Sequence, residues 1–153
     1  PRYADPESAV LPLDDLPMQL EFYHKLRQKV AGGKITQMAI VIVEEKPTKE
    51  DIVKARKEFP QYIKITADLE QEIIAIGGEY HADAEKILVE KYNSQRSNIW
   101  GGGYNITLDI FEVNAIINLH PGINDSTDIL DPDIRNRFLE LVKKVLGDIK
   151  SLL

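Results

Sequence analysis

The segment YIKITADLEQEIIAIGG, residues 62–78, decides the fold of this 153-residue chain. In its first part, residues 62–67, apolar residues alternate with residues that carry a polar group. One face of a strand would therefore carry Ile63, Ile65 and Ala67. A turn around residues 68–71 leads to a second apolar run at residues 72–76, which a pair of glycines ends. Two short strands joined by a tight turn predict a β-hairpin, and therefore an antiparallel sheet.

Two further elements are predicted directly before this hairpin. The apolar run at residues 38–43 predicts an interior strand, because apolar residues on both faces of a strand have to be covered. Thr48 then caps a helix that runs to Phe59, and Asp51 stands three residues after Thr48 as in a capping box. The hairpin is therefore expected to belong to a larger sheet with at least one helix packed on it.

Strands and a long helix are predicted after the hairpin. Residues 97–110 predict a strand that is interrupted at the glycines 101–103, and residues 111–119 predict the last strand. The final helix is the clearest element, with Asp131 as its N-cap and Pro132 at its first position. An apolar stripe at helical spacing follows: Ile134, Phe138, Leu141, Val142, Val145, Leu146 and Ile149.

This order of elements predicts an α+β fold, an antiparallel sheet of about five strands whose one face is covered by helices. We expect residues 1–37 to form an N-terminal arm with one amphipathic helix at residues 17–30, and residues 38–153 to form a single α+β domain. Four of the eight prolines lie within the first 17 residues of the arm. Residues 1–38 carry as many acidic as basic residues, so the net charge of −6 belongs to the rest of the chain.

The composition excludes several classes of protein. The 43% of hydrophobic residues fits a globular domain, and no apolar run approaches the ~20 residues of a membrane-spanning helix. The net charge of −6 makes nucleic acid an improbable partner. Without cysteine there is no disulfide and no thiolate metal site. The start of the chain lacks the pattern of a signal peptide, so we expect a cytoplasmic protein with no membrane partner.

The segment GGEYHADAE, residues 77–85, is the strongest candidate for chemistry. Its second half fits a helix, but the first half, which directly follows two glycines, favours a strand. On a strand, Glu79, His81 and Asp83 would lie on one face, together with Glu85. These side chains could hold a divalent metal ion such as Mn²⁺, Zn²⁺ or Mg²⁺, or His81 could act as a general base. Alternatively, the segment is only a solvated polar face.

Two other places carry candidate residues. His120 ends the last predicted strand beside an acidic loop, where it could be a further metal ligand or only a strand terminus. Arg96 and Trp100 precede and begin the run WGGG, and together they could form a pocket for an anion or a nucleotide. The run itself is not a phosphate-binding loop, because no Lys-Ser pair and no predicted helix N-terminus follow it.

Several motifs occur here in a fixed order: GGEYHAD at residues 77–83, WG at 100–101, IN followed by Pro121, and DPDIR at 131–135. In these motifs the chain resembles a family of small uncharacterised prokaryotic proteins, classed as a domain of unknown function, over residues 38–147. His120 stands where this family is expected to have arginine, and the glycine triplet replaces a more ordinary strand. The resemblance implies no activity, and the arm lies outside it.

Three functions of different class follow from these observations. The first is a non-catalytic binding or interaction domain that forms homo-oligomers through the N-terminal arm. The second is a metal-dependent hydrolase that uses Glu79, His81 and Asp83, with His120 as a further ligand. The third is an anion-binding or nucleotide-binding pocket around Arg96 and Trp100. Whether the protein is an enzyme, and whether it needs a cofactor, is left open by the sequence.

Overall fold

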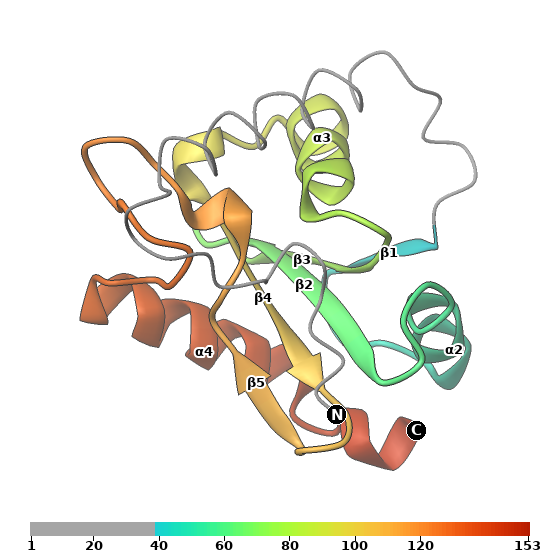
Figure 1. Ribbon diagram of the computed structural model, residues 1–153. Coiled ribbons are helices and arrows are strands. Elements are labelled where there is room, and N and C mark those ends of the chain that lie inside the picture. The colour runs from blue at the N-terminus through green and yellow to red at the C-terminus, as the bar shows by residue number, and fades with distance from the viewer. Residues whose placement is uncertain (1–38) are drawn as a thin grey trace.

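The structure is a computed structural model that describes residues 39–153 (Figure 1). The predicted arm, with its helix at residues 17–30 and its role in self-association, lies outside the described residues. The described chain has an α+β fold around one sheet, as predicted. Its helices and strands are, in chain order, β1 (Ile40–Val43), α2 (Lys49–Ala55), β2 (Tyr62–Asp68), β3 (Ile73–Gly77), α3 (His81–Tyr92), β4 (Ile99–Asn105), β5 (Ile110–Glu112) and α4 (Pro132–Leu146). Three short 3₁₀ helices accompany them, η3 (Arg96–Asn98), η4 (Ile116–Asn118) and η5 (Ile149–Leu152).

The five strands are all antiparallel and lie in the order β1-β3-β2-β4-β5. The predicted hairpin is confirmed, since β2 pairs with β3 and Ala67 stands opposite Ile74. Its turn is held by Asp68, whose Oδ1 accepts hydrogen bonds from the backbone N–H groups of Glu70 and Gln71. Burial alone would raise the pKa of Asp68, but these bonds and those from the Ser94 and Gln71 side chains lower it.

Helices cover both faces of the sheet, not one face as the sequence predicted (Figure 1). The apolar residues of α2 and α4 share one core with one face of the sheet, to which Ile63, Ile65 and Trp100 contribute. On the opposite face α3 and η4 pack on a smaller cluster that includes Ile73 and Ile99. The second face is covered because residues 81–92 form the helix α3, whereas a strand was expected for the start of this segment.

The first strand is an edge strand, so the prediction that it lies in the interior of the sheet was wrong. Among the described residues β1 pairs only with β3. Its run of apolar residues has another cause, which is that helices cover both of its faces. Val43 belongs to the core under α2 and α4, and Ile40 belongs to a cluster under α3.

Both predicted helix starts are confirmed, because each depends on a local cap. Thr48 and Asp51 form a complete capping box at α2, although the helix ends at Ala55 and not at Phe59. The Asp131 side chain accepts hydrogen bonds from the first turn of α4, and Pro132 is the first residue of that helix.

The strand β4 continues through the three glycines, so the predicted interruption was wrong. All seven residues of β4 pair with β2. A side chain at these glycines would meet other parts of the protein: a Cβ at Gly103 would lie 2.2 Å from the Tyr62 ring, and one at Gly101 would lie 2.8 Å from Ala115 and Ile117. The glycines therefore mark places where β4 comes very close to neighbouring atoms.

The last strand is much shorter than predicted. β5 ends at Glu112, and η4 occupies residues that were expected to continue the strand. Beyond the end of β5, the side chain of Asn118 pairs with β4 instead of another strand. Its Oδ1 accepts from the N–H of Gly101 (2.8 Å) and its Nδ2 donates to the carbonyl of Gly101 (2.9 Å), as a peptide group of a neighbouring strand would do.

The β4–β5 hairpin is tied to the C-terminus through Asp109. The Tyr104 hydroxyl donates a hydrogen bond to Asp109, and Lys150 forms an ion pair with the same carboxylate at 2.7 Å. Burial raises the pKa of Tyr104 to about 12, and the bond to Asp109 adds to this effect. The hydrogen bonds from Lys150 and Tyr104 lower the pKa of Asp109.

We predict that Tyr104 stabilises the fold up to alkaline pH. A tyrosine in the unfolded chain ionises near pH ~10. Because the folded-state pKa of Tyr104 is about 12, its contribution is complete below pH ~10 and is lost as the pH rises through about 12. An ultraviolet titration of tyrosinate should show a late alkaline phase that Tyr104→Phe removes. A titration in which Tyr104→Phe leaves that phase in place would contradict the assignment.

Candidate functional site

The segment that follows the two glycines is the start of a helix, so the preference for a strand was wrong. Gly77 and Gly78 both have positive φ angles, 86° and 90°, and they turn the chain from β3 into α3. The N-cap is Tyr80, which makes no side-chain capping bond, so the usual sequence signal of a helix start is missing. The predicted common face of alternating side chains therefore does not exist.

The polar residues of this segment are not a solvated face either. His81 and Asp83 are fully buried, and Glu85 is 3% exposed. The Nε2 atom of His81 lies 2.8 Å from the carbonyl oxygen of Gly102, so this nitrogen carries the proton and donates. Since its donor is committed to the backbone of β4, His81 anchors α3 on the sheet.

A buried lysine accompanies this helix start. Lys64 on β2 is 1% exposed, and its ammonium group donates to the carbonyl oxygen of Glu79. The Nζ atom also lies 4.9 Å from the centre of the Phe59 ring and 5.6 Å from that of Tyr80. The side chain of Glu79 is exposed, and only its backbone takes part in this arrangement.

The structure does not bring the predicted metal ligands Glu79, His81, Asp83 and His120 together as a site. Within residues 39–153, no group of three or more His, Asp or Glu side chains is placed to hold a metal ion. The helix start separates the exposed Glu79 from the buried His81 and Asp83, and His120 contacts Trp100. The metal-dependent hydrolase therefore stays a prediction that this geometry does not support.

Arg96 is oriented by a buried carboxylate. Its Nε atom donates to Oε1 of Glu85 at 2.9 Å, and the Glu85 side chain is 4% exposed while that of Arg96 is 56% exposed. The guanidinium thus has one nitrogen fixed against α3 while its Nη groups offer further N–H donors. Such a fixed fork suits the two oxygens of a carboxylate or phosphate.

His120 stacks on Trp100. The two ring centres lie 4.2 Å apart with an angle of 29° between the rings. Trp100 is 3% exposed and belongs to the core beneath the sheet. The backbone of His120 is held in a tight turn, because its carbonyl accepts from the N–H groups of Ile123 and Asn124.

Arg96 and His120 line one hollow of about 230 Å³ near the start of β4, although 23 residues separate them in the sequence. We call this cavity the Arg96 hollow. It is lined by Arg96, Ser97, Leu119, His120, Pro121 and Ile123. Two residues that the sequence placed in different candidate sites are therefore brought together. Trp100 was predicted to line an anion pocket with Arg96. It is not among the residues that line this hollow, and its ring stacks on that of His120.

Two buried asparagines hold the loop that carries His120. Besides its bonds to Gly101, Asn118 donates to the carbonyl of Thr127 at 2.9 Å. Asn124 donates to the carbonyls of Asn118 (2.9 Å) and Asp128 (2.8 Å), and it accepts from the N–H of Leu130. The sequence did not predict that these asparagines support the loop, and it placed Glu85 beside the candidate metal ligands rather than with Arg96. An asparagine inside the apolar run IINL was the one available signal.

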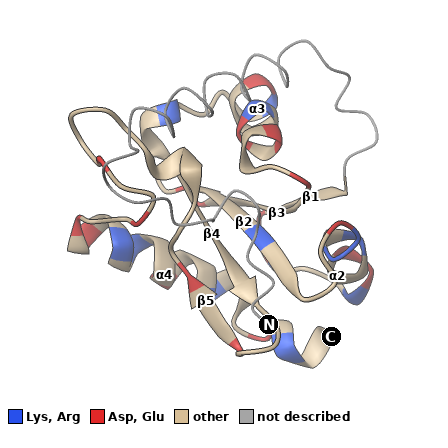
Figure 2. Ribbon diagram, viewed as in Figure 1, with Lys and Arg blue, Asp and Glu red and all other residues tan. Residues whose placement is uncertain are grey.

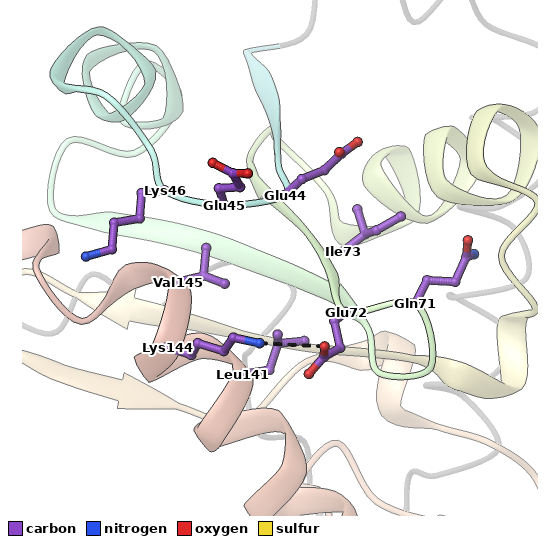
Figure 3. A pocket seen from close by; sticks show the side chains of 9 residues that line it. All are labelled: Glu44, Glu45, Lys46, Gln71, Glu72, Ile73, Leu141, Lys144 and Val145. Atoms are coloured by element: carbon purple, nitrogen blue, oxygen red, sulfur yellow. Dashed lines mark ion pairs between the residues drawn. The ribbon is translucent and has the colours of Figure 1, made fainter.

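A larger cavity, about 720 Å³, lies between α4 and the β2–β3 turn (Figure 3). Its floor is apolar, with Leu141 and Val145, and its rim carries charges of both signs. Lys144 forms an ion pair with Glu72 across it at 3.6 Å, which Figure 3 shows as a dashed line. The lining carries three glutamates and two lysines, and both lysines are paired with a carboxylate, Lys144 with Glu72 and Lys46 with Asp148.

Figure 2 shows acidic and basic residues interspersed along α2, α3 and α4. Within residues 39–153, no helix has both the length and the hydropathy that a membrane span requires.

Comparison with models of protein families gives a match. The sequence model of a family described as Protein of unknown function (DUF5674) matches residues 41–145, which include every strand except the first residue of β1, together with α2, α3 and almost all of α4. The comparisons with curated proteins and with solved structures give no match.

Proposed function

Since the chain belongs to the family DUF5674, a membership that assigns it no activity, we propose a function from the geometry alone. The domain is a non-catalytic binding module that holds a small anionic ligand in the Arg96 hollow. The observation that carries this proposal is the convergence of Arg96 and His120 on one cavity, with the guanidinium held by the buried Glu85.

The chemistry of the hollow favours an anion. A guanidinium whose Nε is already bound has lost part of its side-chain freedom, so less entropy is lost when its remaining N–H groups bind a ligand. Ser97 offers a hydroxyl donor on the same wall. Glu85 reduces the net positive charge near the hollow, so we expect binding to depend on the directed hydrogen bonds of Arg96 and to be of modest affinity.

This proposal predicts that small anions bind in an Arg96-dependent manner. We expect acetate and inorganic phosphate to shift the amide and Trp100 indole resonances of the ¹⁵N-labelled chain, with saturation. Because removal of Arg96 alone would take an ion-pair partner away from the buried carboxylate of Glu85, the test uses the double variant Glu85→Gln/Arg96→Met. The affinity of this double variant for acetate and phosphate should be roughly tenfold lower or more, because at least one charge-assisted hydrogen bond to the anion is lost.

Lys91→Met is the matched control, since it removes one positive charge from an exposed position of α3 that does not line the hollow. It should leave the affinity unchanged. The double variant leaves the net charge unchanged, because it removes one negative and one positive charge. Weakening in Lys91→Met without weakening in the double variant would therefore show that the anions respond only to net charge, and the proposed site would then be wrong.

Self-association through residues 1–37 is a separate part of the proposal. It is supported by the distinct composition of this segment, which is rich in proline and has no net charge, unlike the rest of the chain. Size-exclusion chromatography with light scattering should give an oligomer for the full chain and a smaller species after deletion of residues 1–37. A full chain that elutes as a monomer would refute this part and leave the Arg96 hollow unaffected.

A further inference from the structure

The Arg96 hollow joins a polar segment of the chain to an apolar one. Arg96 and Ser97 belong to η3, and the three apolar residues of the lining, Leu119, Pro121 and Ile123, lie close together in the loop after η4. A ligand that fills the hollow therefore meets hydrogen-bond donors from one segment and aliphatic side chains from the other.

Ile123 stands out among these apolar residues because it lies at the surface. With 69% of its surface exposed, it is the most exposed large hydrophobic residue in the part of the chain that the structure describes. Leu119, in contrast, is only 4% exposed. A ligand that covers Ile123 removes apolar surface from water, and this burial favours binding.

The turn that carries Ile123 is closed by backbone hydrogen bonds. The N–H groups of Ile123 and Asn124 donate to the carbonyl of His120 at 2.9 and 2.8 Å, and the N–H of His120 donates to the carbonyl of Asn124 at 3.0 Å. Gly122, with φ +77°, allows the chain to reverse at this point. Because the turn is already ordered, a ligand loses little free energy in fixing this wall.

The charges around the hollow favour a ligand with a single negative charge. Among the six lining residues, Arg96 alone carries a permanent positive charge. The carboxylate of Glu85 accepts from its Nε at 2.9 Å, and the carboxylate of Asp125 accepts from the N–H of Gly122 at 3.2 Å. Each further negative charge on a ligand is repelled by these two carboxylates. A carboxylate is therefore better suited to the hollow than phosphate.

Resting on the proposed function, we infer that the Arg96 hollow binds a monocarboxylate with a short aliphatic tail. The carboxylate binds the remaining N–H groups of Arg96, and the tail lies against the three apolar residues of the lining. The volume of about 230 Å³ is below the ~300–1,000 Å³ of typical cofactor and drug-sized sites, so the tail has only a few carbon atoms. Ile123 is in this account the residue that selects ligands with a tail.

The test compares acetate, butyrate, hexanoate and inorganic phosphate as probes of the ¹⁵N-labelled full chain. The amide resonances of Ser97 and Ile123 report on the two segments that line the hollow. Affinity should rise roughly twofold to fourfold for each added methylene, the range for a methylene that is half to fully buried. Hexanoate should bind more tightly than phosphate, which has no tail and carries more charge.

Two variants separate the contact with the tail from the contact with the carboxylate. Ile123→Ser should reduce the preference for hexanoate over acetate roughly threefold or more, because the tail loses an apolar partner. The double variant Glu85→Gln/Arg96→Met should instead weaken both acids by a similar factor. Val53→Ser is the matched control, since Val53 is 65% exposed on α2 and does not line the hollow. It should leave the preference for hexanoate unchanged.

Three results would overturn the inference and leave the proposed function in place, provided that the double variant still weakens binding. They are equal affinities of the three acids, tighter binding of phosphate than of hexanoate, and an undiminished preference for hexanoate in Ile123→Ser. If neither the acids nor phosphate bind to the unchanged protein, the proposed function and the inference are both wrong.

Discussion

Replacement of Asn118 by aspartate is expected to lower the free energy of unfolding by about 3–5 kcal/mol, a large part of the stability of a domain of this size. The substitution keeps the shape of the side chain but exchanges the Nδ2 donor for an oxygen. That oxygen would face the carbonyls of Gly101 and Thr127, both 2.9 Å from Nδ2, and that of Val113 at 3.3 Å. Acceptors that lose their donor in the interior cost about 1–3 kcal/mol each.

Urea unfolding followed by circular dichroism measures this effect, with Asn136→Asp as the matched control. Asn136 is exposed on α4, so the same chemical change there should alter the free energy of unfolding by less than about 0.5 kcal/mol. A loss below about 1 kcal/mol for Asn118→Asp would show that the side chain does not replace a strand beside Gly101. An unchanged m value would show that the two variants unfold to comparable states.

Replacement of Gly102 by alanine is expected to destabilise the domain by about 3 kcal/mol or more. A Cβ at this position would lie 2.1 Å from the backbone oxygen of Glu112 and 3.0 Å from the ring of Phe138. The first contact is with backbone, so β5 has to move away from β4, and the second would displace α4. The same shift would also disturb the carbonyl of Gly102 that His81 binds.

The control for this prediction is Gly122→Ala. Gly122 has φ +77° but nothing within 4 Å of an added Cβ, so alanine there should cost only the backbone strain of about 1–2 kcal/mol. Thermal and urea unfolding of the two variants measure the difference directly. If the two variants lose the same free energy of unfolding, β5 does not lie as close to Gly102 as the structure shows.

Local signals in the sequence were sufficient for the elements whose ends are capped. Thr48 with Asp51 and Asp131 with Pro132 carry their hydrogen bonds within one turn, so four residues of sequence contain the whole interaction. Helix α3 has no such cap at Tyr80, and its first turn is polar yet buried. A pattern of apolar residues gives only a weak signal for that helix, because three of the six residues it buries, His81, Asp83 and Glu85, are polar.

The site depended on long-range contacts that no local pattern contains. Arg96 and Trp100 were recognised as neighbours in sequence, and His120 was assigned to another site. They meet because the loop after β5 folds back over β4, where Asn118 binds Gly101. The edge position of β1 is likewise a property of strand order, which the composition of a strand does not encode when both of its faces are covered.

The bonds between Asn118 and Gly101 also bear on the dynamics of the domain. They fasten the loop that carries His120 to β4, an interior strand of the sheet, rather than to another loop. This loop cannot lift away while the sheet keeps its hydrogen bonds, so it should open together with β4 as one cooperative unit. A ligand in the Arg96 hollow would then slow the opening of the sheet itself. The time for which the ligand stays bound would depend on how often the whole domain opens.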